Sequence, residues 1–303
     1  MSMVVQDTVH SDPSVAPLIN AALGMSIRGA IARPFGGMYG FWNAFEARTT
    51  ELGVTIHRGL PVQSIAPAQK GQRGRYQLTT DRGYFTADVV VCTLPIWDAA
   101  RVGPPAVADA LARWCRRDES ALGGAAMLSM GVPEDEVGGH AFTHHQFLPE
   151  PGGPLGNGNN CFLSVSSPGD TLSAPAGYRV AMLTTHVELD GWTNLDDAGH
   201  IQAKKVLGDR LLDIARVAYP DLGRRAQWLE CASPKTYARF TRRYKGSVGG
   251  TRLTLRNSNQ RAVPHNIGVA GWVQAGDTTW PGLGTTACAI CSEIAADDAC
   301  RAV

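Results

Sequence analysis

The sequence predicts an α/β fold in which a second domain interrupts the first. Two stretches carry this prediction: a continuous apolar run from Asp88 to Leu94, and a strand, turn and helix pattern from Asn266 to Ala296. A short apolar run that stops at a proline, here Pro95, is typical of a strand buried on both faces of a sheet. From Trp97 to about Glu230, between the two stretches, the composition shifts, so we expect a separate module there.

The composition narrows the class of protein. The chain has 303 residues, of which 44% are hydrophobic and 18% charged, as in a globular protein with one large domain or two smaller ones. A net charge of +1 without a basic block argues against nucleic-acid binding. No apolar run reaches the roughly 18 residues of a membrane span. The seven scattered cysteines indicate a reduced, cytoplasmic protein, and peripheral membrane contact stays open.

The first part of the chain is predicted to form a tail, a helix and several strands. Residues 1–33 are expected to form an N-terminal tail with a short helical patch. Phe41, Trp42, Phe45 and Leu52 predict a helix that ends at Gly53, where a glycine can take the left-handed conformation. The expected strands that follow are 54–56, 62–65 and the two arms of a hairpin that turns at residues 81–83.

The middle of the chain has its own alternation of elements. Residues 149–160 are rich in glycine, proline and asparagine and are expected to form a loop. The other elements expected here are a helix around 111–115, strands at 123–130 and 179–189, and an amphipathic helix at 199–219.

The stretch near the C-terminus contains the residues that indicate a ligand-binding site. A strand is expected through Ile267 to Trp272, and Gly276 and Asp277 place a carboxylate at a bend. Residues 281–284, Pro-Gly-Leu-Gly, then remove side chains where a helix begins. Such a helix start presents bare N–H groups and the positive end of the helix dipole to an electron-rich group.

The helix that follows is expected to be buried along one face. Leu283, Ala287, Ile290 and Ile294 recur at helical spacing and predict that face. Cys288 and Cys291 stand three residues apart within it, and we favour packing over a redox pair. Trp272 and Trp280 flank the bend, and two interpretations stay open for them: a wall for a ligand, or core.

These motifs, in this order, resemble the FAD-dependent phytoene desaturase and carotenoid isomerase family. The resemblance runs from Pro34 onward and includes the Pro-x-Gly-Gly-Met loop, the hairpin, the Asp88–Leu94 strand and the Ser233–Phe240 segment. It implies an incomplete FAD-binding Rossmann-like domain, residues 34–100 and 246–303, interleaved with a mixed α+β substrate domain, residues 101–245. It also implies an oxidoreductase, a desaturase or isomerase, that acts on an apolar, polyene-like substrate.

The resemblance further implies which residues contact FAD. The carboxylate of Asp277 would meet the ribityl–pyrophosphate part, and the backbone of Val62 would meet the adenine. The helix start would face the isoalloxazine ring, and Thr93 would lie beside the cofactor. The implied contacts are Val62, Thr93, Gly276, Asp277, Gly282, Leu283, Gly284, Thr285 and Thr286. The sequence gives no candidate for a catalytic acid or base.

One expected motif is absent from the sequence. The family opens with a strand, a Gly-x-Gly-x-x-Gly turn and a helix, which hold the FAD pyrophosphate. Glycines 152–158 lack the flanking strand and helix, and Gly282-x-Gly284-x-x-Ala287 lacks a second strand after it. Three explanations stay open: a partner chain carries the N-terminal half, the chain is a truncated product of a longer gene, or it is a flavin-free cyclase, isomerase, or binding or regulatory subunit. A homo-oligomer is also open.

Three histidines lie close together in the sequence. His140 and His144 are spaced for one helix face, and His145 follows. A metal site would need a further ligand at matching spacing, so we expect surface or cavity-lining histidines and no metal. No serine stands in an elbow motif that would indicate a Ser-His-Asp triad.

Overall fold

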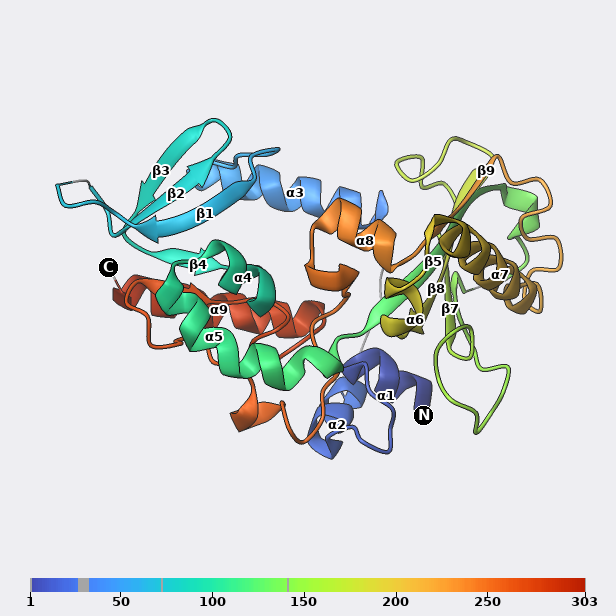
Figure 1. Ribbon diagram of the computed structural model, residues 1–303. Helices are drawn as coiled ribbons and strands as arrows, with labels where there is room; N and C mark the ends of the chain where they lie inside the picture. Colours follow the sequence, from blue (N-terminus) through green and yellow to red (C-terminus); the bar gives the residue numbers. More distant parts are fainter. Residues whose placement is uncertain (1, 27–32, 72, 141, 303) are drawn as a thin grey trace. The chain divides into compact units, whose positions relative to one another are not determined.

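The computed structural model describes residues 2–26, 33–71, 73–140 and 142–302 (Figure 1). The chain forms two compact units. The first unit comprises Met1–Ser26, His57–Gly123 and Thr241–Val303, and the second comprises Ile27–Ile56 and Gly124–Phe240. The mixed α/β class and the interleaved chain agree with the sequence-based prediction, whereas the boundaries between the units fall at other residues.

The boundary differences concern three segments. The expected tail contains α1 (Ser2–Val9) and α2 (Leu18–Ser26), and both helices belong to the first unit. Residues 101–123, expected in the substrate domain, also belong to the first unit, and residues 34–56 belong to the second. Residues 27–32 of the expected tail lie outside the described residues.

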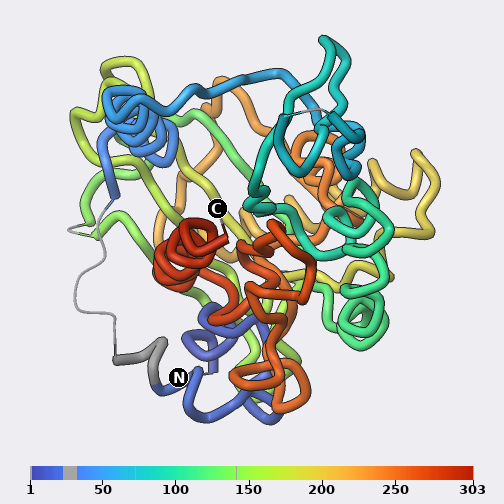
Figure 2. Tube along the Cα trace, turned by 90° about the vertical axis from the view of Figure 1, so that its left-hand side faces the viewer, coloured from blue at the N-terminus to red at the C-terminus, as the bar shows by residue number. Residues whose placement is uncertain are grey.

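The N-terminal helices are held by contacts that the local sequence does not show. Val5 and Val9 of α1 pack with Leu253 and Leu283, which are more than 240 residues further along the chain. The N–H of Leu253 donates to the carbonyl of Val9 at 2.9 Å. Figure 2 shows the dark blue helices beside the orange C-terminal segment. A pattern read over a few residues cannot reveal such a partner.

The first unit contains a small parallel sheet that carries a helix. β4 (Val90–Cys92) pairs in parallel with β10 (Trp272–Gln274). α9 (Thr285–Ala302) packs on this sheet through Cys291 and Ala295, which meet Val273 and Ala275. β4 is shorter than the expected strand, because only three residues are hydrogen-bonded in it. The strand expected through Ile267 to Trp272 was a wrong prediction: Gly268 and Gly271 take positive φ values, so this segment is irregular and β10 begins only at Trp272.

An antiparallel meander completes the sheets of this unit. It consists of β1 (Val62–Pro67), β2 (Tyr76–Thr80) and β3 (Gly83–Ala87). The expected hairpin is confirmed, and Gly83 supplies the positive φ, 115°, at its turn. Tyr76 joins the meander to β10: its ring lies edge-on to Trp272 at 6.2 Å, and its hydroxyl donates to the carbonyl of Ala270 at 2.6 Å.

The remaining elements of the first unit are helical. α4 (Ile96–Val102) and α5 (Pro105–Asp118) follow β4 directly. The short 3₁₀ helices are η1 (Glu119–Ala121), η3 (Tyr244–Gly246) and η4 (Asn259–Arg261). The strand expected at residues 54–56 was a wrong prediction: the segment is irregular, with Val54 and Ile56 exposed, so no apolar burial supports a strand there.

The second unit is built on a five-stranded antiparallel sheet with the order β6-β7-β8-β5-β9. Its strands are β5 (Gly124–Pro133), β6 (His144–Phe147), β7 (Cys161–Val165), β8 (Tyr178–Val187) and β9 (Trp228–Ala232). One face packs against α7 (Asp197–Ala215), which begins where the side chain of Asp196 accepts the N–H of Gly199 at 2.7 Å. This cap satisfies one of the free donors of the first turn.

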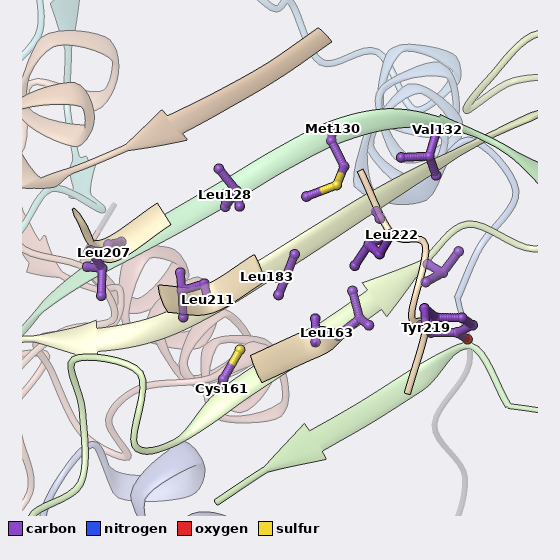
Figure 3. Packing of buried hydrophobic residues seen from close by; sticks show 14 of the residues in the cluster. Leu128, Met130, Val132, Cys161, Leu163, Leu183, Leu207, Leu211, Tyr219 and Leu222 are labelled. Carbon is purple, nitrogen blue, oxygen red and sulfur yellow. The ribbon is translucent and has the colours of Figure 1, made fainter. Parts of the chain in front are cut away.

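Alternate residues of these strands form the core of the second unit (Figure 3). Leu128, Leu163 and Leu183 point to one face of the sheet and are buried together with Leu211 of α7. The period of two residues is that of a sheet covered on one side. The other elements of this unit are α3 (Gly37–Glu51), α6 (Asp190–Thr193), α8 (Pro234–Thr241) and the 3₁₀ helix η2 (Glu134–Glu136).

α3 is the helix expected from the aromatic residues near the N-terminus. The N–H of Gly36 donates to both carboxylate oxygens of Asp170, at 3.0 and 3.1 Å, and so fixes the start of the helix. None of the helix residues is buried within the chain. Phe41, Trp42 and Phe45 form an exposed aromatic cluster on this helix.

Candidate functional site

All the residues that the sequence singled out for a cofactor lie in the first unit. Thr93 follows β4, and Gly276 and Asp277 follow β10. Residues 282–286 form the loop before α9 and its first turn. Val62 stands apart at the start of β1, where it pairs with Thr80 of the meander.

The two parallel strands end side by side. Gln274 is in register with Cys92, and the N–H of Ala275 donates to the carbonyl of Cys92 at 2.8 Å. One residue further on, Gly276 has φ 101°, and a Cβ placed there would lie 2.9 Å from the carbonyl oxygen of Thr93. The glycine therefore lets the two strand ends approach each other. In open α/β sheets, ligands bind at the carboxyl ends of the parallel strands.

The start of α9 faces open space. Gly282 and Gly284 have φ 120° and 97°, and a Cβ on Gly284 would meet nothing within 4 Å. The first intrahelical bond runs from the N–H of Cys288 to the carbonyl of Gly284, so the N–H groups before it have no acceptor within the helix. Residues 284–286 are exposed. The helix thus offers unsatisfied donors and its positive dipole end to a ligand.

Asp277 is held by a residue that the sequence did not indicate. One guanidinium nitrogen of Arg243 donates to both carboxylate oxygens, at 2.9 and 3.1 Å, and the two side chains are 21% and 18% exposed. The Nε of Arg243 donates to the carbonyl of Ser247 at 2.9 Å. The ion pair neutralises Asp277 but leaves lone pairs on both oxygens, since a carboxylate accepts about four hydrogen bonds.

Cys291 and Thr279 hold the bend at Gly276 through hydrogen bonds. The Sγ of Cys291 accepts the N–H of Gly276 at 3.1 Å, and the hydroxyl of Thr279 donates to the carbonyl of Gly276 at 2.7 Å. Cys291 is buried in the packing of α9 on the sheet, which confirms the packing role expected for it. Burial, the nearby Asp277 and Cys291 raise the pKa of the Cys288 thiol, so that thiol stays protonated near neutral pH.

The two tryptophans have different surroundings. Trp272 is buried against Tyr76, and its Nε1–H donates to the side chain of Gln274 at 3.3 Å, so it is a core residue. Trp280 is 39% exposed and lines a pocket with Pro264 and His265.

The histidines lie in the second unit. His145 shares a hydrogen bond of 2.9 Å with the hydroxyl of Tyr219, and His140 lies edge-on to the same tyrosine. Within the described residues, no group of three or more possible metal ligands comes together. Burial lowers the pKa of both His144 and His145, and the nearby positive charges of Arg33 and His140, respectively, lower it further.

The second unit also carries a half-open apolar surface. The residues of the sheet that point away from the α7-covered core are only partly buried. This face includes the apolar side chains of Met127, Phe162, Val180 and Met182. Polar residues of β5 and β8, among them Ser129 and Thr184, share this face. Ser164 of β7 also lies there, 3.2 Å from the Nε2 of His144, and accepts a hydrogen bond of 2.7 Å from Arg33.

Comparison with known proteins places the chain in a family. A profile described as flavin containing amine oxidoreductase matches residues 23–290. The chain belongs to the flavin-containing amine oxidoreductase family. The sequence-based prediction of a flavin oxidoreductase family is thereby confirmed, and FAD is the cofactor that this family membership implies.

The curated relatives that this chain matches are named prolycopene isomerases. The chain is 24% identical to the chloroplastic prolycopene isomerase of Arabidopsis thaliana over 291 residues, which cover 90% of the chain and 46% of that protein. The prolycopene isomerase of Daucus carota gives 24% over 288 residues, covering 90% and 45%. The chain therefore spans about half the length of the curated relatives that it matches.

Solved structures of other proteins, among them two oxidases or oxidoreductases, show the same fold. An oxidoreductase from Methanosarcina mazei aligns with a TM-score of 0.68 at 17% identity, over 98% of this chain and 63% of that one. Cyclohexylamine oxidase from Brevibacterium oxydans aligns with a TM-score of 0.56 at 14% identity, with the same coverage. At these identities the likeness concerns the fold, and it confirms the Rossmann-like and substrate-domain class. Among the described residues, no helix has the length and apolar character needed to cross a bilayer.

The residues around Asp277 fit the ring end of a flavin. Gly284 leaves space for a flat ring, and the unsatisfied N–H groups suit its electron-rich edge. Asp277 keeps lone pairs for ribityl hydroxyls despite its ion pair with Arg243. Thr93 and Gly276 are brought together with this group, whereas Val62 lies in a different sheet.

Proposed function

We propose that this chain belongs to an FAD-dependent oxidoreductase for an apolar, polyene-like substrate. It supplies the substrate domain and the part of the cofactor domain that contacts the flavin ring. The observation that carries the proposal is the start of α9. Its open N–H groups stand after the glycine bend that joins the ends of β4 and β10. This is the place where an α/β sheet binds a cofactor.

The proposal gives each residue a role toward the flavin. The backbone of Gly282 to Thr286 would stabilise negative charge on the ring, because the helix dipole and the N–H groups point there. Asp277 would accept hydrogen bonds from the ribityl chain, and Thr93 would line the same cavity. Val62 would contact the adenosine through its backbone, as the family resemblance implies. A bound flavin would supply the two-electron redox chemistry.

Two observations support an apolar substrate. The second unit presents a half-buried sheet face with Met127, Phe162 and Met182. Flexible methionines suit long apolar ligands, because the unbranched thioether side chain adapts to irregular shapes. The curated relatives are named prolycopene isomerases. Arg33, Ser164 and His144 would place one polar contact on this face.

The proposal includes a dinucleotide-binding segment with a glycine-rich turn. Within the described residues, β4 pairs only with β10, so one edge of β4 is open. Val91 on this strand is 43% exposed. A parallel strand from the dinucleotide-binding segment would pair with the open edge, and the helix of that segment would cover this apolar side chain. The segment would also supply the pyrophosphate contacts, whether it lies on the same polypeptide or on a partner chain.

The experiment compares two variants that break the same ion pair. Asp277→Ala removes the proposed flavin ligand, whereas Arg243→Gln frees the carboxylate and leaves it in place. We expect Asp277→Ala to weaken FAD binding, measured by quenching of flavin fluorescence, by about tenfold, the value of one lost hydrogen bond to a charged group. Arg243→Gln should change the affinity by no more than about threefold.

Thermal unfolding of both variants serves as the control for the fold. Equal weakening by the two variants at equal stability would assign Asp277 a structural role and contradict the proposed contact. Absence of flavin binding in the native chain would favour the flavin-free alternatives, a cyclase or isomerase or a binding subunit.

A further inference from the structure

A second pocket of the first unit is lined mainly by arginines. The C-terminal half of α5 and the segment 256–264 line an open pocket of about 390 Å³. None of the proposed flavin contacts lines it. Its lining includes Arg113, Trp114, Arg117, Arg256 and Arg261.

The positive charge in this pocket is only partly balanced. Arg117 forms a two-pronged pair with Asp118, at 2.6 and 2.7 Å. In the part of the chain that the structure describes, Arg113, Arg256 and Arg261 have no carboxylate partner. Three unbalanced guanidinium groups around one small volume repel one another, and an anion between them would remove this repulsion.

The pocket is built by specific contacts around its arginines. Trp114 is 7% exposed, and the guanidinium of Arg113 lies 4.0 Å from the centre of its ring. Arg117 donates to the carbonyl of Arg261 at 2.6 Å, and Arg261 donates to the carbonyl of Leu255 at 3.0 Å. The first bond ties the loop to α5 and the second holds the loop itself, so the loop loses less conformational entropy when a ligand binds.

The loop is also held internally. Asn257 is buried and accepts the N–H of Thr254 at 2.8 Å, while its own amide donates to the carbonyl of Arg252 at 2.9 Å. Arg256 stands on this turn, exposed, with its backbone N–H directed to the hydroxyl of Thr254. The turn thus presents Arg256 from a fixed backbone.

We propose that this pocket binds a phosphate monoester or diphosphate group. Guanidinium groups match phosphate oxygens with paired hydrogen bonds, which makes arginine the preferred residue for such anions. A neighbouring pocket of about 660 Å³ shares Gln260, Ala262 and Pro264 with this one and extends to Trp280. It gives room for the rest of a phosphorylated molecule beside the anion.

The test measures binding of inorganic pyrophosphate to the full chain by calorimetry. Arg113→Gln/Arg256→Gln removes two charges, neither of which has a carboxylate partner in the described structure. Arg82→Gln, at the exposed turn between β2 and β3, is the matched control for charge loss. We expect saturable binding that the double variant weakens at least about tenfold and that the control leaves within about twofold.

A second arm separates a free phosphate from a lipid headgroup. Vesicles of phosphatidylcholine with and without phosphatidic acid are sedimented with the native chain and the double variant. Binding of pyrophosphate, or of phosphatidic acid vesicles, that depends on Arg113 and Arg256 supports the site. The probe that binds shows whether the anion is a free phosphate or a lipid headgroup. The proposal is overturned if neither probe binds saturably, or if Arg82→Gln weakens binding as much as the double variant does.

The flavin proposal is independent of this result. Asp277→Ala should leave pyrophosphate binding unchanged, because Asp277 does not line the arginine pocket. A change of pyrophosphate affinity in Asp277→Ala, above all an increase through the freed Arg243, would place the anion at the flavin site and overturn the separate pocket.

Discussion

Single glycines determine the geometry around Asp277. Gly250 has φ 73°, and a Cβ on it would lie 2.2 Å from the carbonyl oxygen of Asp277. Gly276, on the other side of that residue, would meet the carbonyl of Thr93. The backbone at the candidate site is therefore packed too closely for any other residue type.

Gly250→Ala should destabilise the first unit strongly. The left-handed conformation costs alanine about 1 kcal/mol, and the clash with Asp277 forces a backbone shift in addition. Gly268→Ala is the matched control, because Gly268 has φ 83° and nothing within 4 Å of a Cβ. The midpoint of urea unfolding measures both. An equal loss of stability in the two variants would mean that the close approach to Asp277 does not matter.

The residues of the site were only partly predictable. A glycine and an aspartate after an apolar strand indicate a bend with a carboxylate, and Asp277 lies at that bend. Its partner Arg243 is 34 residues earlier in the chain, and no spacing rule connects the two. Thr279 and Cys291 hold Gly276 through contacts that only the folded chain creates.

At the scale of elements, α9 shows a limit of helical periodicity. The spacing predicted a buried face with Leu283, Ala287, Ile290 and Ile294. This prediction is wrong for Ile290. Ile290 is 43% exposed, and the helix buries Cys291 and Ala295 instead. Small side chains let α9 lie close to β10, so the burial follows the backbone distance and not the hydrophobicity of the residue.

The two faces of α9 should respond differently to substitution. Ala295→Leu inserts a large side chain against Val273 and should cost about 1–3 kcal/mol in the free energy of unfolding. Ile290→Ala, on the exposed side, should change it by less than about 0.5 kcal/mol. Chemical denaturation of the two variants decides between the faces. A larger loss for Ile290→Ala would restore the face that the spacing predicted.

Elements with a strong local pattern were predicted well, and their partners were not. The hairpin of β2 and β3, the start of β5 and the helix α7 follow the predicted ranges closely. α3 also forms as predicted, yet its aromatic residues stay exposed. Periodicity reports that a segment can bury one side, whereas the segment that covers it is set by the tertiary structure.

At the scale of the whole molecule, the interleaving of the chain was the hardest feature to locate. The order of motifs predicted two domains with a broken first domain. The boundaries differ because α1, α2 and the region of α5 join the first unit through long-range contacts. These contacts join residues far apart in the sequence, so a pattern read over neighbouring residues does not mark the boundaries.

The histidines of the second unit should make its stability depend on pH. Burial lowers the pKa of His144 and His145 below the ordinary 6.5. The unfolded chain then binds more protons below pH 6.5 than the folded one, so the free energy of unfolding decreases as the pH falls through this range and is constant above it. We expect a lower urea midpoint at about pH 5.5 than at about pH 7.5.

A pair of variants checks the origin of this pH effect. His144→Gln/His145→Gln should reduce the difference between the two pH values, whereas His57→Gln, an exposed histidine of the first unit, should leave it unchanged. An unaltered difference in the double variant would assign the effect to other groups.

The central claim is that this chain contacts the ring and ribityl part of a flavin. Titration of the native chain with riboflavin and with FAD, followed by flavin fluorescence, tests it most directly, because riboflavin has the ring and the ribityl chain but no phosphate. The account predicts saturable binding of both, with dissociation constants within about tenfold of each other. It is contradicted if neither flavin binds, or if FAD binds more than about a hundredfold more tightly than riboflavin, since the phosphate and adenosine parts would then carry most of the binding in this chain.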